Sequence, residues 1–202
     1  MTNLTLYSAQ PSRGLANQWL LEELGVAYEL RLLDLDQDEH KSDEYKAINP
    51  MAKVPALVHG STIVTESSAI NMYLAEQFLE KGLSVAPDSS LRGDYLRWCM
   101  FAPITAEPSL MATALNLTHP AYEPFADLNV VAETLRLALK DREFIVGDTF
   151  TTADVAVGSF VYWGFNLIPI LPQHPELVDY WSRLSKRPAW IKSSDSLEQP
   201  ND

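Results

Sequence analysis

The sequence has little cysteine and little positive charge. Its 202 residues include one cysteine, Cys99, and 15 lysines and arginines against 27 aspartates and glutamates, for a net charge of −12. A lone cysteine cannot form an internal disulfide or a cysteine-only metal site, which is typical of a reducing compartment. A surface this acidic repels phosphate groups. We therefore expect neither nucleic acid nor an anionic membrane as a partner.

Long hydrophobic runs are also missing. The most apolar stretch, from Val155 to Phe165, has about 11 residues, whereas a membrane-spanning helix needs about 20. The first residues contain no basic segment followed by an apolar one, so we expect no secretory leader. Together with the single cysteine, this predicts a cytoplasmic protein.

Several motifs of well-known enzymes are absent from the sequence. The four histidines are scattered and include no His-x-x-x-His pair, so we expect no metal. No Gly-x-Gly-x-x-Gly segment, phosphate-binding glycine loop or Gly-x-Ser-x-Gly turn occurs. A nucleotide-dependent enzyme and a serine hydrolase of the usual kind are therefore disfavoured.

The first 80 residues combine strand and helix patterns. Polar and apolar residues alternate in two segments, as in half-buried strands. Between these segments, apolar residues recur at helical spacing, and the expected helix ends at Gly25. This order predicts a β-α-β unit with parallel strands. A short helix, a hairpin and a further helix follow. The expected strands are 3–7, 28–32, 56–58 and 62–64, and the expected helices are 15–24, 43–48 and 67–79.

The rest of the chain shows only helical patterns. The expected helices are 91–114, 127–142, 152–166 and 176–186, and we expect Pro103 and Pro108 to kink or break the first of them. Thr151 and Asp154 form a Thr-x-x-Asp capping box, which is a folding signal. We expect a domain at 1–80, a linker at 81–90 and an all-helical domain at 91–202.

The loop from Ser8 to Arg13 joins the first strand to the first helix. A hydroxyl group there lies near unpaired amides and the positive end of a helix dipole, which favours an anion site. The alternative interpretation is that Ser12 simply caps the helix.

The segment Lys53-Val54-Pro55 opens the third strand. A cis bond before Pro55 would turn the Val54 backbone outward to meet an extended ligand, although only about 5–6% of X-Pro bonds are cis. Lys53 would direct a cation to the same edge. Alternatively, Lys53 is a solvated lysine beside an edge-strand proline.

The segment Thr65-Glu66-Ser67-Ser68 precedes the last helix of the first domain. Glu66 can bind the ammonium of an amino-acid group, while the Ser67 hydroxyl and amide bind its carboxylate. A helix cap with a glutamate that compensates the dipole explains these residues equally well.

These three features, in this order on a β-α-β-α-β-β-α frame, resemble the cytosolic glutathione S-transferase family. The resemblance extends over nearly the whole chain, and it carries features of the theta, phi and beta classes. It is carried by the segments Leu6-Tyr7, Leu21–Glu29, Asn49-Pro50, Val54–Leu57, Thr65–Ile70, Phe150–Asp154 and Lys186–Ala189. The resemblance implies an α/β thioredoxin-like domain that binds glutathione, followed by an all-α domain that shapes the site for an electrophile.

The resemblance also implies roles for individual residues. Val54 would bind the cysteinyl part of glutathione, Pro55 would be the cis proline, and Glu66 and Ser67 would hold the γ-glutamyl end. Three cationic side chains match a pattern that neutralises the glycyl carboxylate: His40, Lys41 and Lys53.

The catalytic hydroxyl has three candidates. Ser12 aligns with the serine of phi-like members and the cysteine of beta-like members, so it ranks first, ahead of Tyr7 and Ser8. A hydroxyl beside a helix N-terminus favours the thiolate form of glutathione. The electrophile would contact Phe101, Leu110, Met111 and Trp163, although these are equally good core residues.

The expected function is therefore glutathione transfer to a small hydrophobic electrophile, with glutathione as co-substrate. The resemblance implies a homodimer as well. Two alternatives stay open: a non-catalytic binding or regulatory protein on the same fold, and glutathione-dependent peroxide reduction.

Overall fold

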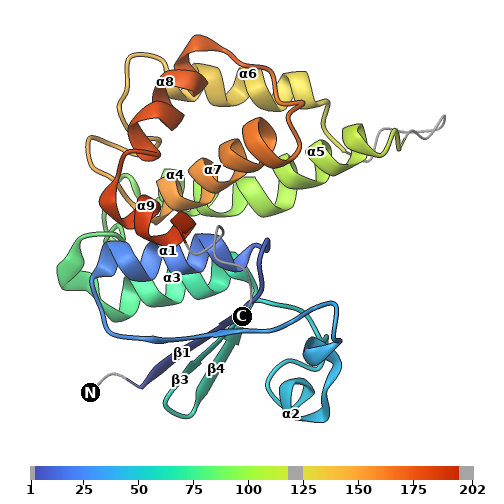
Figure 1. The fold of residues 1–202 in the computed structure, drawn as a ribbon. Coiled ribbons are helices and arrows are strands. Elements are labelled where there is room, and N and C mark those ends of the chain that lie inside the picture. Colours follow the sequence, from blue (N-terminus) through green and yellow to red (C-terminus); the bar gives the residue numbers. More distant parts are fainter. Residues whose placement is uncertain (1–2, 118–124, 196–202) are drawn as a thin grey trace. The chain divides into compact units, whose positions relative to one another are not determined.

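A computed structural model describes residues 3–117 and 125–195 (Figure 1). The chain divides into two compact units. The first contains residues 3–81 and 187–195, and the second lies within residues 82–186. Among the described residues, no helix is both long enough and apolar enough to cross a membrane.

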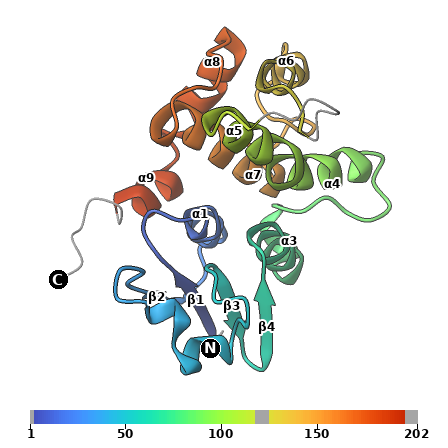
Figure 2. The same cartoon turned by 90° about the vertical axis from the view of Figure 1, so that its right-hand side faces the viewer.

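The first unit is built on a four-stranded mixed sheet. The strand order is β2-β1-β3-β4, with β1 parallel to β2 and antiparallel to β3 (Figure 2). The strands are β1 (Leu4–Ser8), β2 (Glu29–Leu32), β3 (Ala56–His59) and β4 (Thr62–Thr65). The β-α-β unit and the hairpin that the sequence predicts are both present, and the sheet has the thioredoxin-like order of elements.

Two helices cover one face of this sheet, α1 (Gly14–Leu24) and α3 (Ser67–Gln77) (Figure 2). Strand β1 alternates between the two faces, so Leu4 and Leu6 are buried while Tyr7 points the other way. Gly25, in the left-handed conformation, ends α1 as the sequence predicts. The short helices η1 (Glu39–Lys41) and α2 (Asp43–Lys46) follow β2, and η2 (Leu79–Lys81) follows α3.

Helix α9 (Pro188–Asp195) belongs to the first unit. Arg187 donates two hydrogen bonds to the Glu23 carboxylate, at 2.6 and 2.8 Å, and Trp190 packs edge-on against Trp19 at 5.0 Å between ring centroids. No sequence pattern predicts this helix, and residues 91–202 were expected to form one helical domain. The difference arises because the partners of α9 lie on α1.

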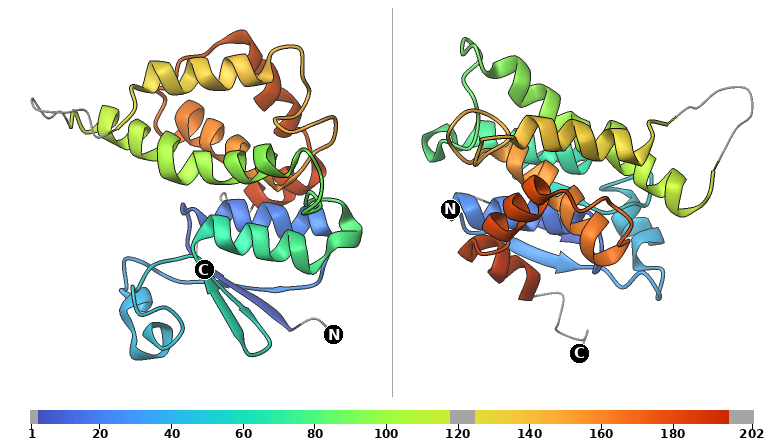
Figure 3. Two further views of the ribbon diagram at one scale, coloured as in Figure 1. Left: turned by 180° about the vertical axis from the view of Figure 1, so that it is seen from behind. Right: turned by 90° about the horizontal axis from the view of Figure 1, so that it is seen from above.

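The second unit is all helical within its described residues (Figure 3). Its elements are α4 (Arg92–Phe101), η3 (Ala102–Ala106), α5 (Glu107–Ala114), α6 (Leu128–Leu139), α7 (Thr152–Tyr162), η4 (Trp163–Leu167) and α8 (Pro175–Leu184). Pro103 does not break the helix. The chain passes through one π-helical turn, η3, between α4 and α5.

The predicted capping box begins α7. The Thr151 hydroxyl accepts a hydrogen bond from the Ala153 amide, and the Asp154 carboxylate accepts one from the Thr151 amide. The same carboxylate also accepts hydrogen bonds from the Ile145 amide at 2.8 Å and the Tyr180 hydroxyl at 2.9 Å. Burial raises the pKa of Asp154 to about 6, against the effect of these donors.

Candidate functional site

The strand register brings the three candidate segments to one end of the sheet. Tyr7 on β1 pairs with Ala56 on β3, which pairs with Thr65 on β4. The residues that adjoin this row are Ser8, Pro55 and Glu66. Three segments that are separate in the sequence therefore meet where α1 and α3 begin.

The loop after β1 places two serine hydroxyls side by side. Ser8 is buried and Ser12 is half-buried, with 3.3 Å between their Oγ atoms. The Ser12 oxygen accepts hydrogen bonds from the Gly14 amide at 3.1 Å and the Ala9 amide at 3.4 Å. Because two amides already use the lone pairs of this oxygen, the Ser12 hydroxyl is left to act as a donor.

Gly14 is what allows the two serines to approach. A Cβ atom at position 14 would lie 2.0 Å from Ser8 Oγ and 3.2 Å from Ser12 Oγ. Any larger residue would displace the Ser8 side chain. The loop also contains a cis Gln10–Pro11 bond, which the sequence analysis did not anticipate.

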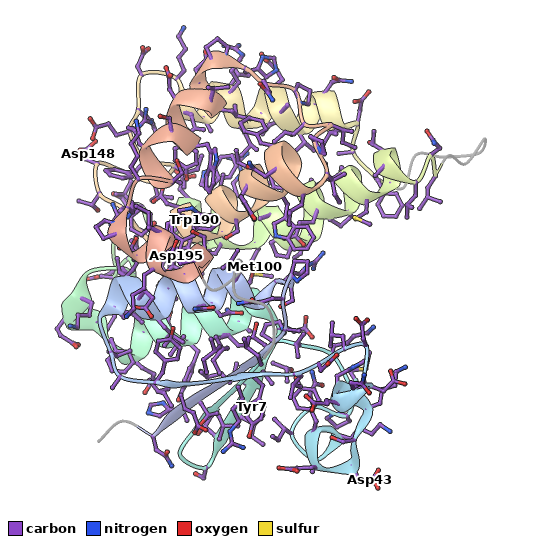
Figure 4. The ribbon with its side chains drawn as sticks, viewed as in Figure 1. Tyr7, Asp43, Met100, Asp148, Trp190 and Asp195 are labelled. Atoms are coloured by element: carbon purple, nitrogen blue, oxygen red, sulfur yellow. The ribbon has the colours of Figure 1, made fainter. Side chains whose placement is uncertain are left out.

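Tyr7 does not join this pair of serines. Its hydroxyl accepts a hydrogen bond from Arg31 Nη1 at 3.2 Å, and its ring lies 5.7 Å from that of Tyr45 on α2. Figure 4 labels Tyr7 at the sheet, on the side toward α2. Strand alternation thus separates Tyr7 from Ser8 and places its hydroxyl on the opposite face of the sheet.

The turn before β3 presents the backbone of Val54. The Val54–Pro55 bond is cis, and the Lys53 carbonyl accepts hydrogen bonds from Tyr45 Oη and Asn49 Nδ2, both at 2.7 Å. Within residues 3–117 and 125–195, the backbone groups of Val54 have no hydrogen-bond partner. The Lys53 side chain is exposed.

Glu66 has an unusual backbone conformation for a non-glycine residue. Its φ is 69° and its ψ is 119°, at the position that immediately precedes α3. Its side chain is exposed and makes no capping hydrogen bond. Such a conformation is strained by about 1–3 kcal/mol and occurs preferentially at ligand sites. A simple helix cap does not explain Glu66.

His40 and Lys41 lie in η1, beside α2. Lys41 pairs with Asp38 at 2.7 Å, and both side chains are largely exposed. His40 is half-buried, and its Nδ1 atom has no hydrogen-bond partner in the described part of the chain. Within the described residues, no hydrogen bond or ion pair joins either side chain to Lys53.

Beneath the site lies a polar pair that the sequence analysis missed. Asn17 Nδ2 on α1 donates hydrogen bonds to the Ser67 carbonyl at 2.8 Å and to Asn71 Oδ1 at 2.6 Å. In the sequence, both asparagines look like ordinary polar residues of a helix, so no local pattern indicates that they are buried.

The four electrophile candidates are not equivalent. Leu110 is only 2% exposed and packs inside the helical unit, whereas Met111 is 38% exposed. Phe101 packs edge-on against Trp98, at 5.1 Å between ring centroids. Trp163 is half-buried and begins the π-helical turn η4.

A thioredoxin-like sheet with a cis proline directly before β3, followed by a helical unit, defines the class of protein. Models of the glutathione S-transferase N-terminal and C-terminal domains match residues 2–76 and 121–188. Glutathione S-transferase A of Pleuronectes platessa is 31% identical over 87% of this chain and 83% of its own. The chain therefore belongs to the glutathione S-transferase family.

Two further similarities agree with this assignment. Glutathione S-transferase F10 of Arabidopsis thaliana is 28% identical over 89% of this chain and 91% of its own. The solved structure of glutathione transferase URE2P6 from Phanerochaete chrysosporium, in complex with oxidized glutathione, is 29% identical, with a TM-score of 0.80 over 97% of this chain and 96% of its own. The expected family and fold are confirmed, and the names of the relatives bear out the expectation of a glutathione S-transferase enzyme.

Proposed function

We propose that this protein binds glutathione at the end of the sheet and activates its thiol for attack on a small hydrophobic electrophile. The observation that carries the proposal is the register that places Ser8, Pro55 and Glu66 side by side. Three segments that offer different chemical groups meet there, and one tripeptide with two charged ends can contact all three.

The glutathione-binding groups follow from their chemistry. Glu66 binds the γ-glutamyl ammonium, and the hydroxyl and amide of Ser67 bind the adjacent carboxylate, because the first turn of a helix leaves its amides without intrahelical partners. The Val54 backbone pairs with the cysteinyl part of the tripeptide as an added strand would. Pro55 fixes the turn that exposes Val54.

Two lysines and one histidine are available for the glycyl carboxylate. Lys53 is adjacent to Val54 and carries an exposed ammonium. His40 and Lys41 lie in η1, and Lys41 would exchange its exposed ion pair with Asp38 for the ligand. Exposed ion pairs contribute little to stability, so this exchange requires little free energy.

Ser12 activates the thiol. A free thiol has a pKa of about 8.5 and is mostly protonated at neutral pH. The Ser12 hydroxyl donates a hydrogen bond to the sulfur, which stabilises the thiolate and lowers the thiol pKa. The thiol proton passes to solvent water, and the sulfur then bonds to the electrophilic atom while the leaving group of the electrophile departs with the electron pair of its own bond. The two amides that donate to Ser12 Oγ polarise its O–H group and strengthen this donation.

The family resemblance assigns electrophile contacts to the helical unit. We keep Met111, Phe101 and Trp163 in this role because each has exposed or half-exposed surface. Leu110 is part of the core of its unit and offers no surface to a ligand. A cytoplasmic homodimer completes the proposal, and light scattering that gives a particle near 22.6 kDa would contradict the dimer.

A glutathione titration tests the proposal directly. Saturable quenching of tryptophan fluorescence reports binding, and ultraviolet absorbance of the bound thiolate against pH reports activation. We expect a thiol pKa clearly below about 8.5. Absence of saturable binding by wild type would contradict the proposed function, and binding without a lowered thiol pKa would contradict the activation step.

A further inference from the structure

A buried amide pair joins the two helices that begin at the candidate site. Asn17 on α1 is 0% exposed and Asn71 on α3 is 2% exposed. Asn17 Nδ2 lies 2.6 Å from Asn71 Oδ1 and 2.8 Å from the Ser67 carbonyl oxygen. One side chain of α1 therefore donates two hydrogen bonds to the first turns of α3.

Stability alone does not explain this pair. Asn17 uses both amide hydrogens, but its Oδ1 atom is buried and has no hydrogen-bond partner among the described residues. A buried acceptor without a partner destabilises the fold, and replacing both members of a buried polar pair by apolar groups of similar shape is often neutral or stabilising. The pair therefore calls for an explanation other than packing.

The hydrogen bond from Asn17 to the Ser67 carbonyl lies next to the strained backbone of the site. Ser67 follows Glu66, whose φ of 69° is unfavourable for a residue with a side chain. Such a conformation persists only where the surroundings hold it. The Ile70 amide donates to the Glu66 carbonyl at 2.9 Å, and Asn17 holds the next carbonyl, that of Ser67.

The first helix links the same pair to Ser12. The amide of Gly14, the first residue of α1, donates to Ser12 Oγ, and Asn17 lies one turn further along this helix. Through Asn17, the start of α1, which carries the thiol-activating loop, is held against the start of α3, which carries Glu66 and Ser67.

We propose that Asn17 and Asn71 are positioning residues for the γ-glutamyl end of glutathione. They fix the rotation and the distance of the first turn of α3, so that Glu66 and Ser67 are in place before the ligand arrives. This inference rests on the proposed function and deepens it. It predicts that glutathione affinity depends on the pair and that the turnover of the bound complex does not.

The double variant Asn17→Leu/Asn71→Leu tests this role, because leucine approximates the shape of asparagine. We expect a urea midpoint equal to or above that of wild type, together with a glutathione Kd and KM raised at least fivefold and a kcat within about twofold. The single variant Asn17→Leu should lower the urea midpoint, because Asn71 Oδ1 then loses its donor. The matched control is Ser193→Ala on α9, which removes the hydrogen bond that another buried polar side chain of the same unit donates to the Ala189 carbonyl and should leave the Kd unchanged.

Wild-type protein labelled with ¹⁵N gives a second measurement that requires no variant to fold. Saturating glutathione should shift the side-chain amide resonances of Asn17, while those of the exposed Asn129 on α6 stay in place. A double variant with wild-type Kd, or unmoved Asn17 resonances, would overturn the positioning role while wild type still binds glutathione. Failure of wild type to bind would instead contradict the proposed function.

Discussion

Two acidic residues at helix starts, Glu66 and Asp154, look alike in the sequence and differ in the structure. Each follows a threonine within a few positions and lies where a negative charge favours the helix dipole. Asp154 is 0% exposed and accepts hydrogen bonds from two amides and the Tyr180 hydroxyl. Glu66 is exposed, makes no capping hydrogen bond and has a positive φ.

This difference separates a folding signal from a candidate binding group. The Asp154 carboxylate accepts its hydrogen bonds from donors of its own unit, in the loop before α7 and on α8. The Glu66 carboxylate points to solvent while its backbone is strained, so the fold gains nothing from it locally. Removal of Asp154 should therefore damage stability, and removal of Glu66 should damage ligand binding.

The largest effect is expected for Asp154→Ala. The substitution leaves two buried amides and the Tyr180 hydroxyl without an acceptor, and each unsatisfied buried donor costs about 1–3 kcal/mol. We expect the free energy of unfolding in urea to fall by about 3–5 kcal/mol. The control is Asp148→Ala, at an exposed position in the loop before α7 (Figure 4), which should change this free energy by less than about 0.5 kcal/mol. Equal effects of the two substitutions would remove the contrast between Asp154 and Glu66.

Much of the fold was predictable because its signals are local. Strand alternation, the apolar spacing of α1, Gly25 and the Thr-x-x-Asp box each act within one segment. Helix α9 was not predicted, because it is short and its partners lie far away: Arg187 and Glu23 are 164 positions apart.

The candidate site was predictable only in part. The sequence, with its family resemblance, identifies Ser12, Val54 and Glu66 as candidates. The strained backbone of Glu66 and the buried Asn17–Asn71 pair depend on contacts between α1 and α3, so no spacing rule anticipates them. The separation of Tyr7 from Ser12 follows from strand alternation and could have been anticipated.

The next largest effect concerns pH. Burial raises the pKa of Asp154 to about 6 from its ordinary value of 3.8. Because the folded protein binds this proton more tightly than the unfolded chain, the stabilising contribution is complete below about pH 4 and is lost as the pH rises to about 6. A shift of about two units corresponds to about 3 kcal/mol.

Unfolding free energies of wild type and Asp154→Asn measured from pH 4 to 7 isolate this contribution. The other carboxylates are common to both proteins, so the difference between the two curves contains only the titration of Asp154. We expect the free energy of unfolding of wild type to fall relative to that of Asp154→Asn as the pH rises, and the difference between the two proteins then to become constant. A constant difference over the whole range would show that the Asp154 pKa is not raised.

For Glu66 we expect an effect on binding with little effect on folding. Glycine accepts a positive φ without strain, so Glu66→Gly should leave the free energy of unfolding within about 1 kcal/mol of wild type. Loss of charge-assisted hydrogen bonds worth about 1.5–3 kcal/mol should weaken glutathione binding roughly 10- to 100-fold. Fluorescence titrations and urea midpoints provide the two measurements. Unchanged affinity with a lowered midpoint would make Glu66 a structural residue like Asp154.

The smallest effect is expected for Ser12→Gly, where a helix-terminal hydroxyl has both a structural and a chemical use. The Gly14 and Ala9 amides lose an acceptor in a half-buried loop, and replacing a helix-terminal serine by glycine usually destabilises by a few tenths of a kcal/mol. The sulfur of bound glutathione loses its donor, so we expect its thiol pKa to rise by about one unit, or about 1.4 kcal/mol, and turnover at neutral pH to fall about tenfold. Glutathione affinity should change little, because Glu66, Ser67 and Val54 remain. Tyr7→Phe is the matched control, since its hydroxyl lies on the opposite face of the sheet and bonds to Arg31. A thiolate titration that shifts in Tyr7→Phe and not in Ser12→Gly would transfer the catalytic role to Tyr7.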